Sequence, residues 1–241
     1  MSAERVVVAV RRARPGDAAA RAQLLRDAHA ALNNDAFVYF FFHEATLQAV
    51  VLVGAGLFIF FGCGLGTLAA LPALAAVIVF LAVRLAHDHM ASVQAARLRA
   101  ERSGWVAERL GPPRPPARVA VERRDAGAAG AEAGAAGALV GTVSVAASRE
   151  AAGGWLQGLA VAPGWRRRGV GRALEAAARE AAARELRYAA LHAVTSELQP
   201  AARAMFHDAG WQCTAAYARP LLGAALTLPL VRLERDLVEP A

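Results

Sequence analysis

The chain has 241 residues, 56% of them hydrophobic, and a formal net charge of +7, a size that accommodates one globular domain together with an unusually apolar segment. All 27 basic residues are arginine, and alanine is abundant, so the positive charge reflects a compositional bias. The sequence has no helix-turn-helix, zinc-binding spacing or concentrated basic helix, so no nucleic acid is expected as a partner. Cys63 and Cys213 form neither a disulfide framework nor a recognisable metal site, so no metal is expected.

The first elements are expected to be a strand, a turn and a helix. Arg5 to Arg12 is rich in valine, which favours a strand. Pro15, Gly16 and Asp17 then form a turn, and Asp17 offers an N-cap for an amphipathic helix from Ala18 to about Ala31. The start of the chain lacks the long apolar core and cleavage site of a signal peptide.

A long uncharged run follows, from Ala45 to Val83. As a single helix rising about 1.5 Å per residue, it would be roughly 58 Å long, close to twice the ~30 Å of hydrocarbon in a bilayer. Three glycines within residues 62–66 interrupt the run. One membrane crossing is therefore too short to account for it.

The glycines divide the run into Ala45 to Phe61 and Thr67 to Val83, and each half is near the minimum length of a membrane span. Most residues of 37–42 at one end are aromatic, and Arg84, His87, Asp88 and His89 lie at the other end, as expected where both ends return to one interface. These features predict a helical hairpin in the membrane. A buried pair of helices in a soluble protein and a single tilted span are the alternatives.

Beyond the hairpin, a polar helix is expected from His87 to Gly104. Prolines in Gly111 to Pro116 break regular structure, Arg118 to Glu122 is expected to form a strand, and Asp125 to Gly137, nearly all alanine and glycine, is expected to be a flexible loop. Two antiparallel strands should follow, at Leu139 to Val145 and Trp155 to Val161.

The second of these strands runs into the most informative stretch of the chain, Val161 to Gly171, which reads Val-Ala-Pro-Gly-Trp-Arg-Arg-Arg-Gly-Val-Gly. An alanine-rich helix, Arg172 to Arg184, begins directly after it. Gly169 and Gly171 let the backbone approach a ligand closely, so that N–H groups at the start of the helix point at one anion. The spacing is neither that of a P-loop nor that of a dinucleotide fingerprint. The natural ligand is a phosphate.

The C-terminal part is expected to contain three strands and a short helix. The strands are Tyr188 to Thr195, Gln212 to Tyr217 and Leu226 to Leu233. Between the first two, the segment 202–211 predicts a helix that begins near Pro200 and is closed by Gly210.

Two segments resemble the signatures of the GCN5-related N-acetyltransferase (GNAT) superfamily. Arg166-x-x-Gly169-x-Gly171 resembles its acetyl-CoA pyrophosphate loop, and residues 202–211 resemble its second signature, Ala-x-x-Leu-Tyr-x-x-x-Gly-Phe. They occur in the same order, with a helix and a strand between them. The resemblance implies an α/β (α+β) fold: a mixed, mostly antiparallel central sheet flanked by helices.

A GNAT domain with a hydrophobic hairpin between its first helix and second strand is similar to the camello-like N-acetyltransferase 8 family. Asn34 to Phe37, Thr195-Ser196 and Leu198-Gln199 resemble that family's pattern. The resemblance implies a membrane-bound acetyltransferase in three parts: residues 1–36 and 91–241 form the GNAT domain, and residues 37–90 form the transmembrane hairpin. It also implies the endoplasmic reticulum or another endomembrane, with the domain in the cytosol, where acetyl-CoA is abundant.

The chemistry implied by the resemblance is transfer of an acetyl group from acetyl-CoA to an amine of a small molecule or protein, with the lipid bilayer as a further partner. In this family the strand carrying Val161 splays from its neighbour, and Val161 N–H is a candidate donor to the thioester carbonyl. For Arg167 and Arg168 a solvated role is equally open. The cofactor-binding residues implied are Leu159, Ala160, Val161, Arg166, Arg167, Arg168, Gly169, Val170, Gly171, Arg172 and Gln199.

Proton transfer is where the chain departs from the superfamily. The position of the tyrosine that protonates the leaving thiolate holds Phe206, which has no proton to give. His192, Thr195, Ser196 and Tyr188 are the available substitutes, although a lone histidine within a strand is also often structural. Two function classes remain open: a membrane-anchored N-acetyltransferase, and a degenerate GNAT domain that binds acetyl-CoA, or a protein or DNA partner, without turnover.

Overall fold

The computed structural model describes residues 6–110, 119–123, 137–148, 153–222 and 226–237. The predicted break at 111–116 and all but the last residue of the predicted loop at 125–137 lie outside them. The helices are α1 (Ala18–Ala30), α2 (Asn33–Phe41), α3 (Glu44–Phe61), α4 (Leu65–Ala69), α5 (Leu71–Arg97), α6 (Val170–Arg184) and α7 (Pro200–Asp208). The strands are β1 (Val6–Arg12), β2 (Ser103–Leu110), β3 (Val119–Arg123), β4 (Leu139–Ala147), β5 (Gly153–Val161), β6 (Ala190–Ser196), β7 (Gln212–Leu222) and β8 (Leu226–Asp236).

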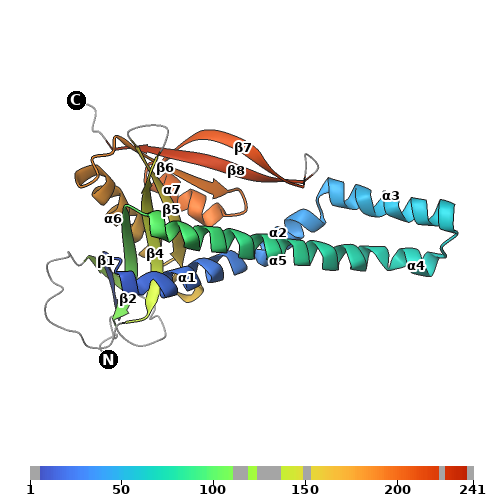
Figure 1. The fold of residues 1–241 in the computed structure, drawn as a ribbon, viewed down its shortest axis with the longest axis horizontal. Coiled ribbons are helices and arrows are strands. Elements are labelled where there is room, and N and C mark those ends of the chain that lie inside the picture. The colour runs from blue at the N-terminus through green and yellow to red at the C-terminus, as the bar shows by residue number, and fades with distance from the viewer. Residues whose placement is uncertain (1–5, 111–118, 124–136, 149–152, 223–225, 238–241) are drawn as a thin grey trace.

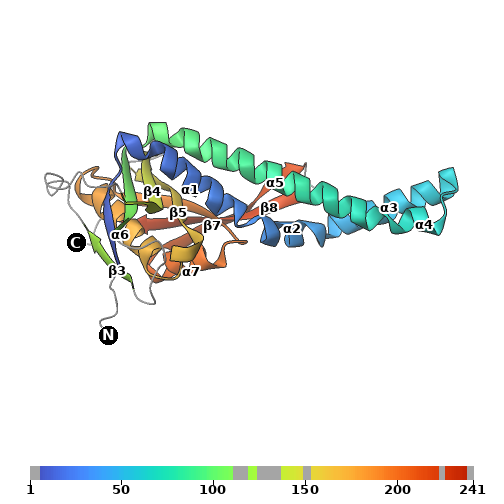
Figure 2. The same ribbon diagram turned by 90° about the horizontal axis from the view of Figure 1, so that it is seen from below.

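The strands form one sheet in the order β3-β1-β2-β4-β5-β6-β8-β7. The pairs β1–β3 and β5–β6 are parallel and the other neighbours are antiparallel. Helix α6 covers one face, while α1 and the C-terminal half of α5 lie side by side over the other (Figures 1 and 2). The predicted mixed, mostly antiparallel sheet flanked by helices is confirmed.

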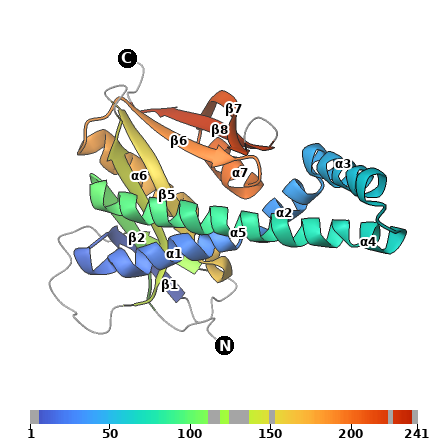
Figure 3. The ribbon, with the colours of Figure 1, turned by 45° about the vertical axis from the view of Figure 1, so that its right-hand side comes forward.

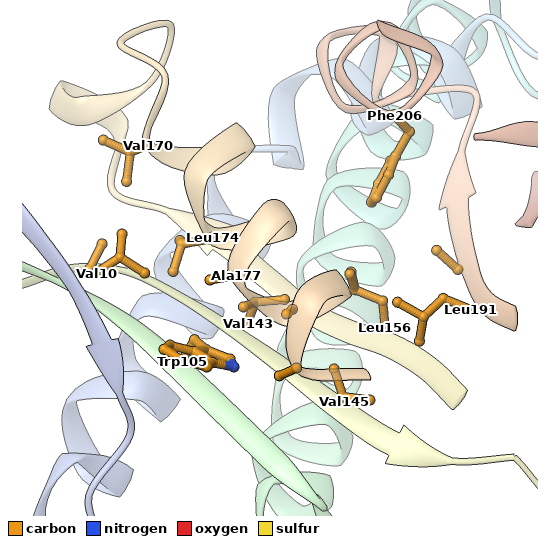
Figure 4. Packing of buried hydrophobic residues seen from close by; sticks show 14 of the residues in the cluster. Val10, Trp105, Val143, Val145, Leu156, Val170, Leu174, Ala177, Leu191 and Phe206 are labelled. Atoms are coloured by element: carbon orange, nitrogen blue, oxygen red, sulfur yellow. The ribbon is translucent and has the colours of Figure 1, made fainter. Parts of the chain in front are cut away.

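The main core lies between the sheet and α6 (Figure 4). Alternate residues of β4, Val143 and Val145, are fully buried on this side, because successive side chains of a strand point to opposite faces. Leu174 of α6 is also fully buried, and the rest of the helix's buried stripe is largely alanine. These small side chains let the helix lie close on the sheet, and each large apolar residue buried there contributes about 1.5–3 kcal/mol.

A buried ionic cluster fixes the opposite face. Arg21 of α1 is 2% exposed, and its two terminal nitrogens each lie 2.6 Å from a carboxylate oxygen of Glu101. The same guanidinium donates to the hydroxyls of Thr142 and Ser144 on β4, both at 2.9 Å. Because Arg21 precedes the hairpin and Glu101 follows it, the cluster clamps both ends of the insertion onto one strand.

Between these ends the chain forms a hairpin of two antiparallel helices, α3 and α5, which projects beyond the domain (Figures 1 and 3). Gly62 closes α3 in the left-handed conformation, with φ 63°, and the short α4 leads into α5. Both helices are long and apolar enough to cross a membrane. Their most apolar windows are 0% and 6% buried, so their side chains do not form a core of the domain. The predicted pair of helices with a glycine turn is confirmed.

The prediction of a polar helix from His87 to Gly104 is wrong at its C-terminal end. Helix α5 stops at Arg97, and β2 begins at Ser103. The residues Trp105, Val106 and Ala107 are 0–2% exposed in the middle of the sheet. Burial of this apolar triplet between β1 and β4 outweighs the helix propensity of the flanking alanine and arginine residues.

Candidate functional site

The parallel strands β5 and β6 separate part of the way along their length. They pair only at Gly153–Ala190, Gly154–Leu191 and Trp155–His192, although β5 runs on to Val161 and β6 to Ser196. On the other side of β5 the register with β4 shifts beside Gly158, whose φ is +63°. A bulge of this kind bends a strand, and the positive φ favours glycine. The bend opens a gap in the sheet.

A cavity of about 120 Å³ lies in this gap. Its walls come from β5, β6, α7, α1 and one side chain of α5. The lining residues are Leu25, Ala28, His29, Leu32, Gln94, Leu156, Gln157, Gly158, Leu159, Ala160, Ala193, Val194, Thr195, Gln199, Ala202 and Phe206.

The loop after β5 brings two glycines to the start of α6. Gly169 is the N-cap of α6 with φ +83°, and nothing lies within 4 Å of where a Cβ atom would be. A Cβ atom on Gly171 would lie 3.2 Å from Met205 Sδ, so this position favours glycine by close packing. The first N–H groups of a helix have no partner within it, and they carry the positive end of its dipole. Phosphate oxygens fit such a site.

The arginines of this loop have different roles in its geometry. Arg166 Nε donates to the carbonyl of Val161 at 3.0 Å, and Arg168 Nε donates to the carbonyl of Gly164 at 3.3 Å, so both side chains brace the loop from within. Arg172 forms an exposed ion pair with Asp208 at 3.1 Å. These contacts hold the loop between the end of β5 and the start of α6.

The cavity and the loop bring together many of the residues predicted from the sequence. Leu159, Ala160 and Gln199 line the cavity, and residues 166–172 lie beyond the end of the same strand. Thr195, 4% exposed, also lines the cavity, and its hydroxyl donates to Gln199 Oε1 at 3.0 Å.

Two predicted catalytic residues do not line this cavity. His192 belongs to the last β5–β6 pair, where it packs against Trp155 with ring centroids 5.3 Å apart and has Nδ1 3.6 Å from Glu234 Oε2. Ser196 Oγ donates to the carbonyl of Pro229 at 3.3 Å and accepts from the backbone N–H of Leu198 at 3.1 Å. The first lies in the closed part of the sheet and the second in the turn before α7.

Phe206 is the residue that the resemblance assigns to the position of the family's tyrosine. It lines the cavity, is 5% exposed, and meets Trp211 edge to face with ring centroids 5.1 Å apart. Its ring is therefore held between the cavity and the core.

Sequence reasoning missed three polar residues of the cavity: His29, Gln94 and Gln157. The first two lie on α1 and α5, which flank the hairpin and reach the cavity only by tertiary packing. The one local signal was a histidine four residues after Leu25, on the face of α1 that packs on the sheet.

Residues 94–211 match the family model described as "Acetyltransferase (GNAT) family". The chain therefore carries an acetyltransferase domain of the GNAT family, for which acetyl-CoA is the acetyl donor. The predicted GNAT fold and enzyme class are confirmed. No curated protein matches the chain.

Several solved structures are similar. The IAA acetyltransferase of Bacillus cereus is 14% identical over 59% of this chain and 81% of its own, with a TM-score of 0.41. The protein yncA of Salmonella typhimurium, solved with its cofactor acetyl-CoA, is 18% identical over 64% and 76%, with a TM-score of 0.42. A Bacillus subtilis acetyltransferase in complex with CoA is 17% identical over 61% and 84%, with a TM-score of 0.41.

Proposed function

We propose that the protein is a membrane-anchored N-acetyltransferase that moves the acetyl group of acetyl-CoA to an amine of a small molecule or protein. The observation that carries this proposal is the gap between β5 and β6 with the anion-binding loop at the end of the same strand. The gap suits the thioester arm, and the loop suits the pyrophosphate of its carrier.

In this proposal the pantetheine arm lies in the gap. Beyond Trp155 the two strands no longer pair with each other, so backbone groups of β5 and β6 are open to amides of the arm. The N–H groups at the start of α6, beginning at Val170, take the pyrophosphate, and the exposed Arg172 adds positive charge. Gln199, at the N-cap of α7, lines the cavity next to Thr195 and accepts its hydrogen bond.

The acceptor amine attacks the thioester carbon, and the electron pair of the broken C–S bond stays on the CoA sulfur. A backbone N–H near the end of β5, with Val161 as the candidate, stabilises the developing oxyanion. Phe206 donates no proton to the sulfur, so the candidate O–H group in the cavity is that of Thr195. A thiolate is a tolerable leaving group, so turnover without the tyrosine is slower rather than absent.

The hairpin is proposed as the membrane anchor. Its outward side chains include Leu52, Phe60 and Phe61, which are 72–81% exposed. So much exposed apolar surface on two paired helices fits lipid rather than water. Both ends of the hairpin return to the domain, which supports an arrangement with the whole GNAT domain on one side of the membrane. We assign that side to the cytosol of an endomembrane, where acetyl-CoA is available.

The insertion between α1 and β2 supports membership of the camello-like N-acetyltransferase 8 family. Within that family, the unbroken run Arg166 to Arg168 before Gly169 supports the N-acetyltransferase 14 branch. The domain division at residues 36 and 90 is part of the same proposal.

The experiment that tests the proposal measures free thiol released from acetyl-CoA by the full chain in detergent, with and without a panel of amines. Amine-dependent thiol release together with the acetylated amine supports it. Acetyl-CoA binding without thiol release favours the degenerate-domain alternative instead.

A further inference from the structure

The cavity between β5 and β6 has an unusual charge content. Among its lining residues in the described part of the chain, His29 is the one ionisable side chain. The other polar lining side chains are three glutamines and one threonine, and the remainder are apolar or glycine. A group that must lose a proton in this cavity therefore has one evident side chain to receive it.

The hydrogen bonding of His29 fixes which nitrogen can act. Nδ1 lies 2.8 Å from the carbonyl oxygen of Leu25, one turn earlier in α1. A carbonyl oxygen only accepts hydrogen bonds, so Nδ1 carries the hydrogen, and in the neutral ring Nε2 carries the lone pair. The half-buried ring lines the cavity with this basic nitrogen uncommitted among the described residues.

The groups around His29 leave it without a carboxylate partner in the cavity. From α5, His87 meets its ring at 6.2 Å between centroids, and His87 Nδ1 is held 2.5 Å from Asn33 Oδ1. On α1 itself, Arg26 and Asp27 are exposed and bond to Gln23. The lining residues of β5, β6 and α7 are uncharged in the described part of the chain.

We propose that His29 is the general base of the acetyl transfer and that the acceptor is a primary amine on an uncharged, largely apolar body. This inference rests on the proposed function. An amine is mostly an ammonium ion near neutral pH and cannot attack until it loses a proton. The walls offer apolar contact but no carboxylate for a second positive charge, so a polyamine is disfavoured.

The protons and electrons of the step balance. Nε2 of His29 takes one proton from the ammonium group. The amine lone pair then forms the C–N bond, the C–S bond breaks, and its electron pair stays on the CoA sulfur. The second N–H proton of the new amide nitrogen is transferred to that sulfur and gives free CoA thiol, while the proton on His29 is released to solvent.

The test uses the full chain in detergent with acetyl-CoA and two probe acceptors, octylamine and spermidine. His29→Gln keeps a polar side chain but no base. We expect kcat with octylamine to fall by about 10²-fold or more, with acetyl-CoA affinity measured by calorimetry unchanged. The control His207→Gln, on an 89% exposed histidine side chain of α7, should match the wild type.

Two further readouts separate catalysis from structure. In the wild type, kcat with octylamine should rise with pH, because a general base acts only in its unprotonated form, and His29→Gln should lose this rise. A wild-type kcat that does not change with pH would overturn the role of His29 even if the variant fails to fold. So would a folded variant with kcat within twofold of the wild type. Preference for spermidine would overturn the acceptor class, whereas a wild type that binds acetyl-CoA and acetylates neither amine would overturn the proposed function itself.

Discussion

The sharpest perturbation of the proposed cofactor site is a negative charge at Gly169, compared with a neutral side chain of the same shape. A Cβ atom at this position would meet nothing within 4 Å, so contacts of the Cβ exclude neither variant. The φ of +83° is strained for most residues, but asparagine and aspartate tolerate it better than others. Gly169→Asn therefore carries the same backbone cost as Gly169→Asp without the charge.

The difference between the two variants can be estimated. A carboxylate about 5 Å from one phosphate charge, at an effective dielectric of about 20, is repelled by roughly 3 kcal/mol. That energy corresponds to a loss of affinity of roughly 10²-fold. Isothermal calorimetry with acetyl-CoA should show near-wild-type binding for Gly169→Asn, within about tenfold, and at least 10²-fold weaker binding for Gly169→Asp. Equal affinities for the two variants would show that the pyrophosphate does not bind at this helix start.

Three other predictions concern proton transfer, the membrane anchor and the clamp, which is the buried ion pair of Arg21 and Glu101. Phe206→Tyr should raise turnover modestly, by less than the ~10²-fold of a fully effective general acid. The new hydroxyl supplies a proton, but it must find a hydrogen-bond partner in a packed position. A variant that binds acetyl-CoA normally yet shows no gain in turnover at any pH contradicts the argument that a general acid is missing. Replacing residues 45–78 with a short Gly-Ser linker retains Val79 and Val83 against α2 and should release a folded domain from membranes. Resistance of the deleted form to alkaline carbonate extraction would mean that the hairpin is not the anchor. Arg21→Met should lower the free energy of unfolding by about 3–5 kcal/mol, since it leaves the Glu101 carboxylate partly buried without its partner. In a urea titration, the double variant Arg21→Met with Glu101→Gln should recover much of this loss. Similar losses in the two variants would mean that the loss comes from packing and not from the unpaired charge.

Local patterns were enough to predict the fold class and the glycine-containing loop between β5 and α6. The glycines at 169 and 171, the arginine run and the alanine-rich helix are contiguous in sequence, so the geometry of the loop follows from neighbouring residues alone. The same holds for the hairpin, whose turn is marked by the glycines between its two apolar halves. These elements were predicted because each is defined over a short stretch of chain.

The parts that were missed depend on tertiary packing. Strand β2 shares alanine and arginine with helix α5, which precedes it, and only its place between β1 and β4 decides its conformation. His192 was a reasonable candidate on β6, but the sequence does not say that β5 and β6 separate just after it. His29 is seventy or more residues from most of the other cavity residues, and it joins them because α1 packs on the sheet beside α5.

The clamp of Arg21 and Glu101 also bears on the order in which the molecule can fold. It joins residues 80 positions apart, and closing a flexible loop of that length costs roughly 4 kcal/mol of chain entropy by the logarithmic law. If α3 and α5 pair first, as adjacent helices joined by a short turn, most of that distance is already spanned by rigid structure. The clamp then closes only the short remaining ends. A hairpin that forms early would thus act as a template that brings α1 and β2 close together before the sheet is complete.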